Sequence, residues 1–291
     1  LYLMLFFYYS YCMKFFKSFT ITVLISFTTT AFCACGGNIA PRLDIQNTLG
    51  VWWWDNRLDS SYLEFAVNNG VDEIYYYTST FSENNRSFIQ SANSYDVSVY
   101  WLTGEYTWIE NPQDFYSELE KYISFQENSE STFSGVHLDV EPHQHPNFEE
   151  RREELIGSYI SFIYNVTTSF PNISFDLDIP FWLDDIITFN GQTKEAYKFL
   201  IDYADRTFIM SYRDSAEKIF DVAREELEYS SSVNKPIFLG VETGDEEDVV
   251  TFNQESKSYM YSELNKLSSL SNLNFGVSIH HIKSWLELKN Y

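Results

Sequence analysis

Eight short apolar runs alternate with amphipathic stretches along most of this chain, and this alternation constrains the fold more than any other feature. Helical patterns with ordinary start residues lie between the runs: Asp59 precedes one stretch, which ends at Gly70, and Asn111-Pro112 precedes another. Further helical patterns cover residues 148–170, 193–204, 215–229 and 254–270. The runs themselves have the length and composition of strands and cover residues 50–55, 72–78, 97–103, 134–141, 173–179, 207–212, 236–242 and 275–281.

The number of these alternations predicts the fold class. Eight β/α units in about 240 residues match the count and length of a (β/α)8, or TIM, barrel. A doubly wound α/β sheet is the alternative, but no glycine-rich phosphate-binding loop follows the first strand. We therefore expect one α/β barrel domain over residues 49–291.

The first 34 residues have the pattern of a signal peptide with an upstream extension. Their only charged residues, Lys14 and Lys17, precede an apolar and hydroxylic stretch at 18–32. We therefore expect the signal peptide to start at Met13, with residues 1–12 as the upstream extension. The string Ala34-Cys35-Gly36 resembles a bacterial lipoprotein cleavage site, which makes Cys35 the expected lipidated residue. We expect a linker at 35–48 and an exported lipoprotein at the cell surface or in the periplasm, with ordinary secretion or an uncleaved anchor as alternatives.

Charge and cysteine content narrow the classes of partner. The chain has 19 Lys and Arg against 42 Asp and Glu, a formal net charge of −23, which repels nucleic acid and anionic lipid headgroups. The three cysteines, Cys12, Cys33 and Cys35, all lie in or beside the signal segment, so we expect no disulfide in the barrel. The negative charge does not exclude neutral or cationic ligands.

In a TIM barrel the active site lies at the carboxyl ends of the strands, so residues at the predicted strand ends are the first candidates. Aromatic rings there suit the faces of sugar rings, and carboxylates suit acid–base chemistry. We therefore predict an oligosaccharide or polysaccharide substrate; the alternative is an acidic, solvated rim with aromatic residues that only pack. The predicted substrate-binding residues are Trp54, Trp101, His137, Asp178, Trp182 and Trp285.

Residues 134–142 are the most informative segment. Strand alternation places His137, Asp139 and Glu141 on one side, toward the mouth of the barrel. Two carboxyl groups two residues apart on one face repel each other, so one should keep its proton near neutral pH, as a general acid requires. A structural ion pair with Arg213 or a lysine is the alternative.

The string from Ser134 to Glu141 resembles the fourth-strand signature D-G-x-D-x-D-x-E of chitinases and endo-β-N-acetylglucosaminidases (glycoside hydrolase family 18). The last Asp and the Glu of the signature fall on Asp139 and Glu141, whereas Ser134 and His137 stand at the two earlier Asp positions. Met210-Ser211-Tyr212 is similar to the M-x-Y of that family.

This resemblance implies a retaining, substrate-assisted mechanism. It implies that Glu141 protonates the glycosidic oxygen, and that Asp139 and Tyr212 hold the acetamido group of the substrate itself. Trp285 lies near the eighth-strand tryptophan of the family, which implies that it forms the floor of a sugar subsite.

A second resemblance is to the retaining glycosidases that use two glutamates. It implies that Glu141 is the acid/base and Glu242, at the end of the seventh predicted strand, is the nucleophile, with Tyr212 nearby. That superfamily normally has Asn before the acid, and Val140 stands there in this chain.

Two alternatives lie outside hydrolysis by carboxylates alone. The barrel could bind glycans without turnover, or the histidines His137, His143 and His145 could hold a metal. We expect no metal and no cofactor, because Pro142 and Pro146 disturb the spacing and no cysteine contributes. His280 and His281 alternate across the last predicted strand, so we expect at most one to face the mouth, in a structural role.

Overall fold

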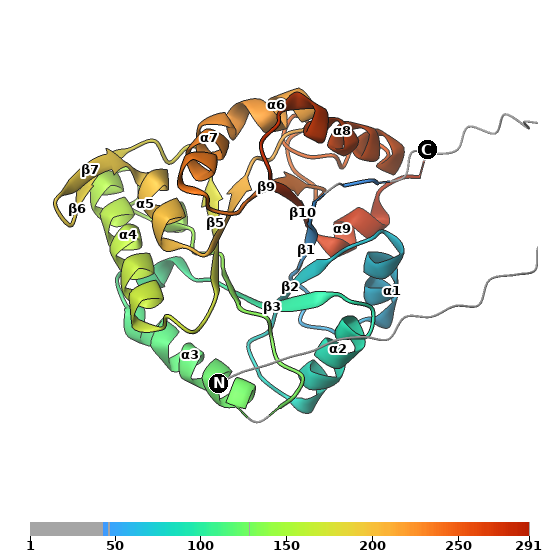
Figure 1. The fold of residues 1–291 in the computed structure, drawn as a ribbon, viewed down its shortest axis with the longest axis horizontal. Coiled ribbons are helices and arrows are strands. Elements are labelled where there is room, and N and C mark those ends of the chain that lie inside the picture. The colour runs from blue at the N-terminus through green and yellow to red at the C-terminus, as the bar shows by residue number, and fades with distance from the viewer. Residues whose placement is uncertain (1–42, 46, 128, 291) are drawn as a thin grey trace, which may run out of the picture. The chain divides into compact units, whose positions relative to one another are not determined.

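The structure is a computed structural model that describes residues 43–45, 47–127 and 129–290. Its central feature is a closed barrel of parallel strands in the order β1-β10-β9-β8-β5-β4-β3-β2, which helices surround (Figure 1). The predicted TIM barrel is confirmed. Cys35 and the signal segment lie outside the described residues.

All eight predicted strands form the wall of the barrel, and their ends lie within about two residues of those expected, except that β4 ends at Leu138, three residues before the expected end at Glu141. They are β1 (Leu49–Trp53), β2 (Glu73–Tyr77), β3 (Ser98–Thr103), β4 (Val136–Leu138), β5 (Phe175–Pro180), β8 (Arg206–Met210), β9 (Ile237–Glu242) and β10 (Gly276–His280).

The helices cover the outer face of this wall (Figure 1). The helical patterns of the sequence missed α2 and α9, and the predicted helix at 215–229 is two helices, separated at Ala223. The helices are α1 (Ser60–Asn68), α2 (Glu83–Asn93), α3 (Pro112–Glu127), α4 (Arg152–Ser169), α5 (Ala196–Tyr203), α6 (Ala216–Val222), α7 (Arg224–Val233), α8 (Lys257–Leu270) and α9 (Ile282–Glu287), with 3-10 turns at Tyr106–Ile109 and Pro142–Gln144.

A β-hairpin interrupts the β/α alternation between β5 and α5. Its strands, β6 (Ile186–Phe189) and β7 (Gln192–Glu195), pair only with each other, antiparallel, outside the barrel wall (Figure 1). The prediction of a helix from residue 193 is therefore wrong at its start. The reason is the turn at Asn190-Gly191, where both residues have positive φ values (49° and 78°), as a two-residue hairpin turn requires.

The interior of the barrel is aromatic and charged rather than aliphatic. Trp52, Tyr75, Phe208 and Phe238 form a buried cluster inside the wall. At the amino-terminal end of the strands, Arg206 donates hydrogen bonds to both carboxylate oxygens of Asp176 (2.8 and 2.5 Å) and to both of Glu73 (2.7 and 2.9 Å). This pairing joins β8 to β5 and β2 across the floor of the barrel.

The last residues of the expected linker pack against the barrel. Leu43 is buried, and the side-chain amide of Asn47 donates a hydrogen bond to the carbonyl oxygen of Phe275 (2.8 Å). Among the residues that the structure describes, no helix combines the length and the apolar character that crossing a membrane requires.

Candidate active site

A cleft of about 630 Å³ opens at the carboxyl ends of the barrel strands. Five carboxyl side chains line it together with aromatic and histidine rings, and no Lys or Arg belongs to its lining. The lining residues are Trp54, Gly104, Glu105, Tyr106, Asp139, Glu141, Gln144, Met210, Tyr212, Glu242, Glu246, His280 and His281. The place matches the position of active sites in TIM barrels.

Asp139 and Glu141 follow β4 directly and stand side by side in the cleft. The backbone N–H of Asp139 donates to the carbonyl oxygen of Thr103 (2.9 Å), which fixes this segment against β3. Gly104 makes the contact possible, because a Cβ atom there would lie only 1.7 Å from the carbonyl oxygen of Asp139. The buried Oδ1 atom of Asp139 has no hydrogen-bond partner among the described residues.

Both of these carboxyl groups hold protons more strongly than usual. Burial raises the pKa of Asp139 well above its ordinary value, and the charges of Asp178 and Glu141 add to the effect. Burial and the charge of Asp178 also raise the pKa of Glu141, although Gln144, which donates to its Oε2 atom, and His280 oppose the change. The pair therefore has a proton to give to a bound substrate.

Glu242 lies across the cleft on β9, and its pKa is shifted in the opposite direction. Its Oε1 atom accepts from the backbone N–H groups of Thr243 (2.7 Å) and Gly244 (2.5 Å), and its Oε2 atom lies 2.6 Å from Nδ1 of His280. Burial alone would raise the pKa of Glu242, but His280 and the two backbone donors outweigh it and lower the pKa. Glu242 is therefore an ionised, firmly held carboxylate.

The hydrogen bonds of His280 determine which of its nitrogens carries the proton. The indole Nε1–H of Trp54 donates to Nε2 of His280 at 2.8 Å, and an indole N–H can only donate. Nε2 is therefore unprotonated, and Nδ1 carries the hydrogen that it donates to Glu242. This chain of bonds fixes the ring of Trp54 at the edge of the cleft.

Tyr212 completes the wall of the cleft beside Glu242. Its ring stacks on the imidazole of His280 with centroids 5.9 Å apart. Burial, followed by the charge of Glu242, raises the pKa of Tyr212 well above its ordinary value. Its hydroxyl group is therefore a neutral hydrogen-bond donor.

His137 and Asp178 lie below the cleft, inside the barrel. They are 0% and 2% exposed, and Nε2 of His137 lies 2.9 Å from both carboxylate oxygens of Asp178. Neither residue lines the cleft, so the burial of both argues against the prediction that they bind substrate directly.

Two predicted tryptophans also point away from the cleft. Trp101 faces the outer side of β3, where it stacks on Tyr122 of α3 (5.2 Å between centroids). Trp285 is fully buried on α9 and donates to the hydroxyl oxygen of Tyr261 (3.1 Å), so it cannot form the floor of a sugar subsite. Trp182 is half-buried and does not line the cleft; its ring packs against the side chains of His143 and Arg152.

Of the predicted site residues, the structure brings Trp54, Asp139, Glu141, Tyr212 and Glu242 together in the cleft. His280 and His281 both line it, so the expectation that at most one would face the mouth is wrong; alternation stops at the end of β10. Sequence reasoning assigned no role in the cleft to Gln144 or Glu246. The only feature of the sequence that could have indicated these two residues is their position in loops that follow predicted strands.

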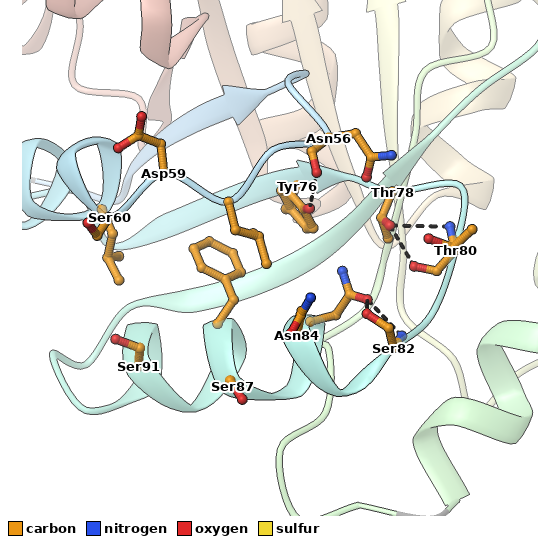
Figure 2. A pocket seen from close by; sticks show the side chains of 14 residues that line it. Asn56, Asp59, Ser60, Tyr76, Thr78, Thr80, Ser82, Asn84, Ser87 and Ser91 are labelled. Atoms are coloured by element: carbon orange, nitrogen blue, oxygen red, sulfur yellow. Dashed lines mark hydrogen bonds between the residues drawn. The ribbon is translucent and has the colours of Figure 1, made fainter.

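A second hollow, of about 600 Å³, lies outside the barrel between α1 and α2 (Figure 2). Hydroxyl and amide side chains line it, and several of them already form hydrogen bonds with nearby residues. Thr78 donates to the carbonyl oxygen of Thr80, and the hydroxyl group of Ser82 donates to Oδ1 of Asn85. Its one carboxylate, Asp59, caps α1 by accepting from Ser61. None of the predicted catalytic residues lies there, so the chemistry points to the cleft in the barrel.

The described residues contain no group of three or more His, Cys, Asp or Glu side chains arranged to hold a metal ion. His143 lies 3.7 Å from Glu141, and His145 lies 3.3 Å from Glu110 instead. The histidines considered as metal ligands therefore separate into different environments.

Comparison with known proteins establishes the fold. No protein family and no curated protein matches the sequence. Among solved structures, the chitinase RmChi1 of Rhizomucor miehei matches with 16% identity and a TM-score of 0.52, over 82% of this chain and 95% of that one. The spore cortex-lytic enzyme SleL of Bacillus cereus matches with 12% identity and a TM-score of 0.51, over 84% and 73%. SleL of Bacillus megaterium matches with 14% identity and a TM-score of 0.50, over 85% and 74%.

Proposed function

We propose that this protein is a retaining glycoside hydrolase that cleaves an N-acetylamino-sugar glycan, with Glu141 as general acid and base. The observation that carries the proposal is the pair Asp139 and Glu141: two adjacent carboxyl groups with raised pKa values in the cleft at the barrel mouth. The structures of similar fold include a chitinase and spore cortex-lytic enzymes, which supports glycan hydrolysis as the class of reaction.

In the proposed first step, Glu141 gives its proton to the glycosidic oxygen, and the bond from that oxygen to C1 breaks. The carbonyl oxygen of the substrate's own 2-acetamido group forms a bond to C1, and the alcohol leaves with the proton. A water molecule then attacks C1 while Glu141 takes its proton, and the acetamido oxygen leaves C1. Two inversions give net retention.

Asp139 and Tyr212 fit the task of holding the acetamido group. The unpartnered Oδ1 atom of Asp139 can accept from the amide N–H, and the neutral hydroxyl group of Tyr212 can donate to the amide oxygen. The ring of Trp54, fixed by His280, offers an apolar face to a sugar.

Glu242 supports a second candidate mechanism. The pKa of Glu242 is lowered whereas that of Glu141 is raised, and opposite pKa shifts of two carboxyl groups in one cleft are typical of an acid and a nucleophile. In this alternative Glu242 attacks C1 and forms a covalent glycosyl intermediate, and the acetamido group is not needed. We favour the first mechanism because Glu242 already accepts three hydrogen bonds.

The variant Glu141→Gln tests the proposed function. Hydrolysis of N-acetylamino-sugar oligosaccharides should fall by about 10²–10⁴-fold while affinity and melting temperature stay nearly unchanged. Glu64→Gln, an exposed charge change on α1, is the control. Unchanged turnover in Glu141→Gln would refute the role of this residue, and a wild-type protein that binds glycans without turnover would favour a binding protein.

We also propose that the protein is exported and anchored to a membrane through lipidated Cys35, on the signal pattern before it. Cys35→Ala should leave the precursor unprocessed or release the protein from membranes, as measured by fractionation and mass spectrometry of the N-terminus. A native protein that carries no lipid at Cys35 would contradict this.

A further inference from the structure

A further hollow, of about 380 Å³, adjoins the cleft between the carboxyl ends of β2 and β3 and the first turns of α3. We call it the side hollow. It shares Gly104 and Glu105 with the lining of the cleft. The ring of Trp54 in the cleft and the ring of Tyr77 in the side hollow are in contact, with centroids 5.6 Å apart. A glycan chain that lies in the cleft can therefore continue into the side hollow.

The side hollow offers a sugar unit both an aromatic surface and a free hydroxyl group. Its volume lies in the range of about 300–1,000 Å³ that is typical of small-molecule sites. The ring of Tyr77 is only partly buried. Thr103 lies on the same side of β3 as Trp101, opposite to Leu102, which points into the barrel. Its side chain is 7% exposed and lines the side hollow, and its hydroxyl group has no hydrogen-bond partner among the described residues. That hydroxyl group is left for a molecule that enters the side hollow.

The charges of the side hollow are negative. Glu105, Asp114 and Glu118 line it, and its lining contains no Lys or Arg. Glu118 forms an ion pair with Lys121 of the same helix (2.7 Å), but Glu105 and Asp114 form no ion pair within the part of the chain that the structure describes. Asp114 lies in the first turn of α3, where the helix dipole favours a negative charge. The side hollow therefore suits a cation.

The arrangement of these groups favours an ammonium group over a metal ion. No group of three or more His, Cys, Asp or Glu side chains in the described ranges is arranged to hold a metal. An ammonium group donates three hydrogen bonds and requires no fixed coordination shell, so separated carboxylates and a hydroxyl group are sufficient for it. Because the side hollow opens from the cleft, the glycan that occupies the cleft is the nearest source of such a group.

We propose that the side hollow is a subsite for a sugar unit with a free amino group, so that the substrate is an amino-sugar glycan that lacks some of its acetyl groups. Glu105 and Asp114 attract the ammonium group, Thr103 bonds to the same unit, and the ring of Tyr77 packs against the sugar. This inference rests on the proposed function, since it needs a glycan in the cleft. The unit at the point of cleavage keeps the acetamido group that the proposed mechanism uses.

The first experiment titrates the wild-type protein with single sugars, which removes any assumption about linkage. At slightly acidic pH, glucosamine should shift the backbone NMR signals of Thr103, Asp114 and Ser117 far more than N-acetylglucosamine does, and salt should reduce the effect. Lysine serves as an amine without a sugar ring. The inference is overturned if glucosamine leaves these signals in place, if both sugars shift them equally, or if lysine shifts them as much as glucosamine does.

The second experiment compares variants on oligosaccharides of equal length, one fully N-acetylated and one partly de-N-acetylated. The measured quantity is the ratio of kcat/KM for the second substrate to kcat/KM for the first. Asp114→Asn should lower this ratio by at least about threefold, and the double variant Glu105→Gln/Asp114→Asn by at least about tenfold. Glu120→Gln removes an exposed carboxylate from the same helix outside the side hollow, and should keep the wild-type ratio.

The two proposals fail in different ways. An unchanged ratio in both folded variants, with activity that still depends on Glu141, would overturn this inference alone. Activity that survives Glu141→Gln would instead refute the proposed function. If the wild type hydrolyses neither oligosaccharide, the titration with single sugars decides whether the side hollow binds a sugar ammonium group.

Discussion

His280 holds Glu242 through a hydrogen bond of 2.6 Å between Nδ1 and Oε2, and two backbone N–H groups occupy the other oxygen. A carboxylate in this state is well placed but has little free electron density to offer to C1. We therefore expect no covalent intermediate on Glu242. Mass spectrometry after incubation with an activated 2-deoxy-2-fluoro glycoside should find no label there, and a labelled Glu242 would establish the two-glutamate mechanism.

Gly104 is expected to be required for the position of Asp139. In Gly104→Ala the new methyl group would lie 1.7 Å from the carbonyl oxygen of Asp139, so the segment must shift. We expect kcat/KM to fall by at least about tenfold and the free energy of unfolding to fall by about 1–3 kcal/mol. Enzyme assays and chemical denaturation measure both.

Gly157, in the middle of α4, is the matched control for that change. No atom lies within 4 Å of a Cβ built there, and alanine favours a helix by up to about 1 kcal/mol over glycine. Gly157→Ala should therefore keep full activity and raise stability slightly. Equal effects of the two variants would contradict the contact between Gly104 and Asp139.

Glu226 should make stability depend on pH. This side chain is 1% exposed, its Oε1 atom lacks a partner, and burial raises its pKa from 4.5 to about 8. The folded state therefore binds a proton more tightly than the unfolded state, and its contribution to stability is lost as the pH rises from 4.5 through about 8. Glu226→Gln should raise the free energy of unfolding at pH 9 by on the order of 1–3 kcal/mol and change it little at pH 4.

Denaturation curves of the wild type and Glu226→Gln at both pH values check this prediction. Glu228→Gln removes another exposed charge on α7 and serves as the control. A stability difference for Glu226→Gln that does not grow with pH would show that the carboxyl group titrates normally.

The cleft should reject anionic glycans. Glu105, Glu242 and Glu246 line it together with Asp139 and Glu141, and its lining contains no Lys or Arg. Oligosaccharides that carry sulfate or carboxylate groups should therefore show kcat/KM at least about tenfold below that of their neutral counterparts, and salt should reduce the difference. A preference for the anionic substrate would contradict this electrostatic reading of the site.

The strands and the acid pair were predictable because both are local patterns. Each strand is a short apolar run between turn residues, and Asp139 and Glu141 lie two residues apart at the end of one predicted strand. The hydrogen bond between Glu242 and His280 was not predictable, because it joins residues 38 positions apart on neighbouring strands. Only the order of strands in the barrel brings them together.

Trp101 shows a second limit of sequence reasoning. Both faces of β3 are buried, since Leu102 lies inside the barrel and Trp101 packs against α3. A strand that is apolar on both faces has no alternation from which to decide which residues point inward. The same ambiguity applied to Trp52, which is inside, and Trp53, which is outside.

The β6–β7 hairpin has a practical consequence. It pairs only with itself, it stands outside the wall, and it contributes no residue to the cleft (Figure 1). Its tight Asn190-Gly191 turn is therefore a natural attachment point for a fluorophore or for a tether to a solid support. A protein attached through this turn would leave the cleft free for long chains, as the proposed hydrolysis of polymeric glycans requires.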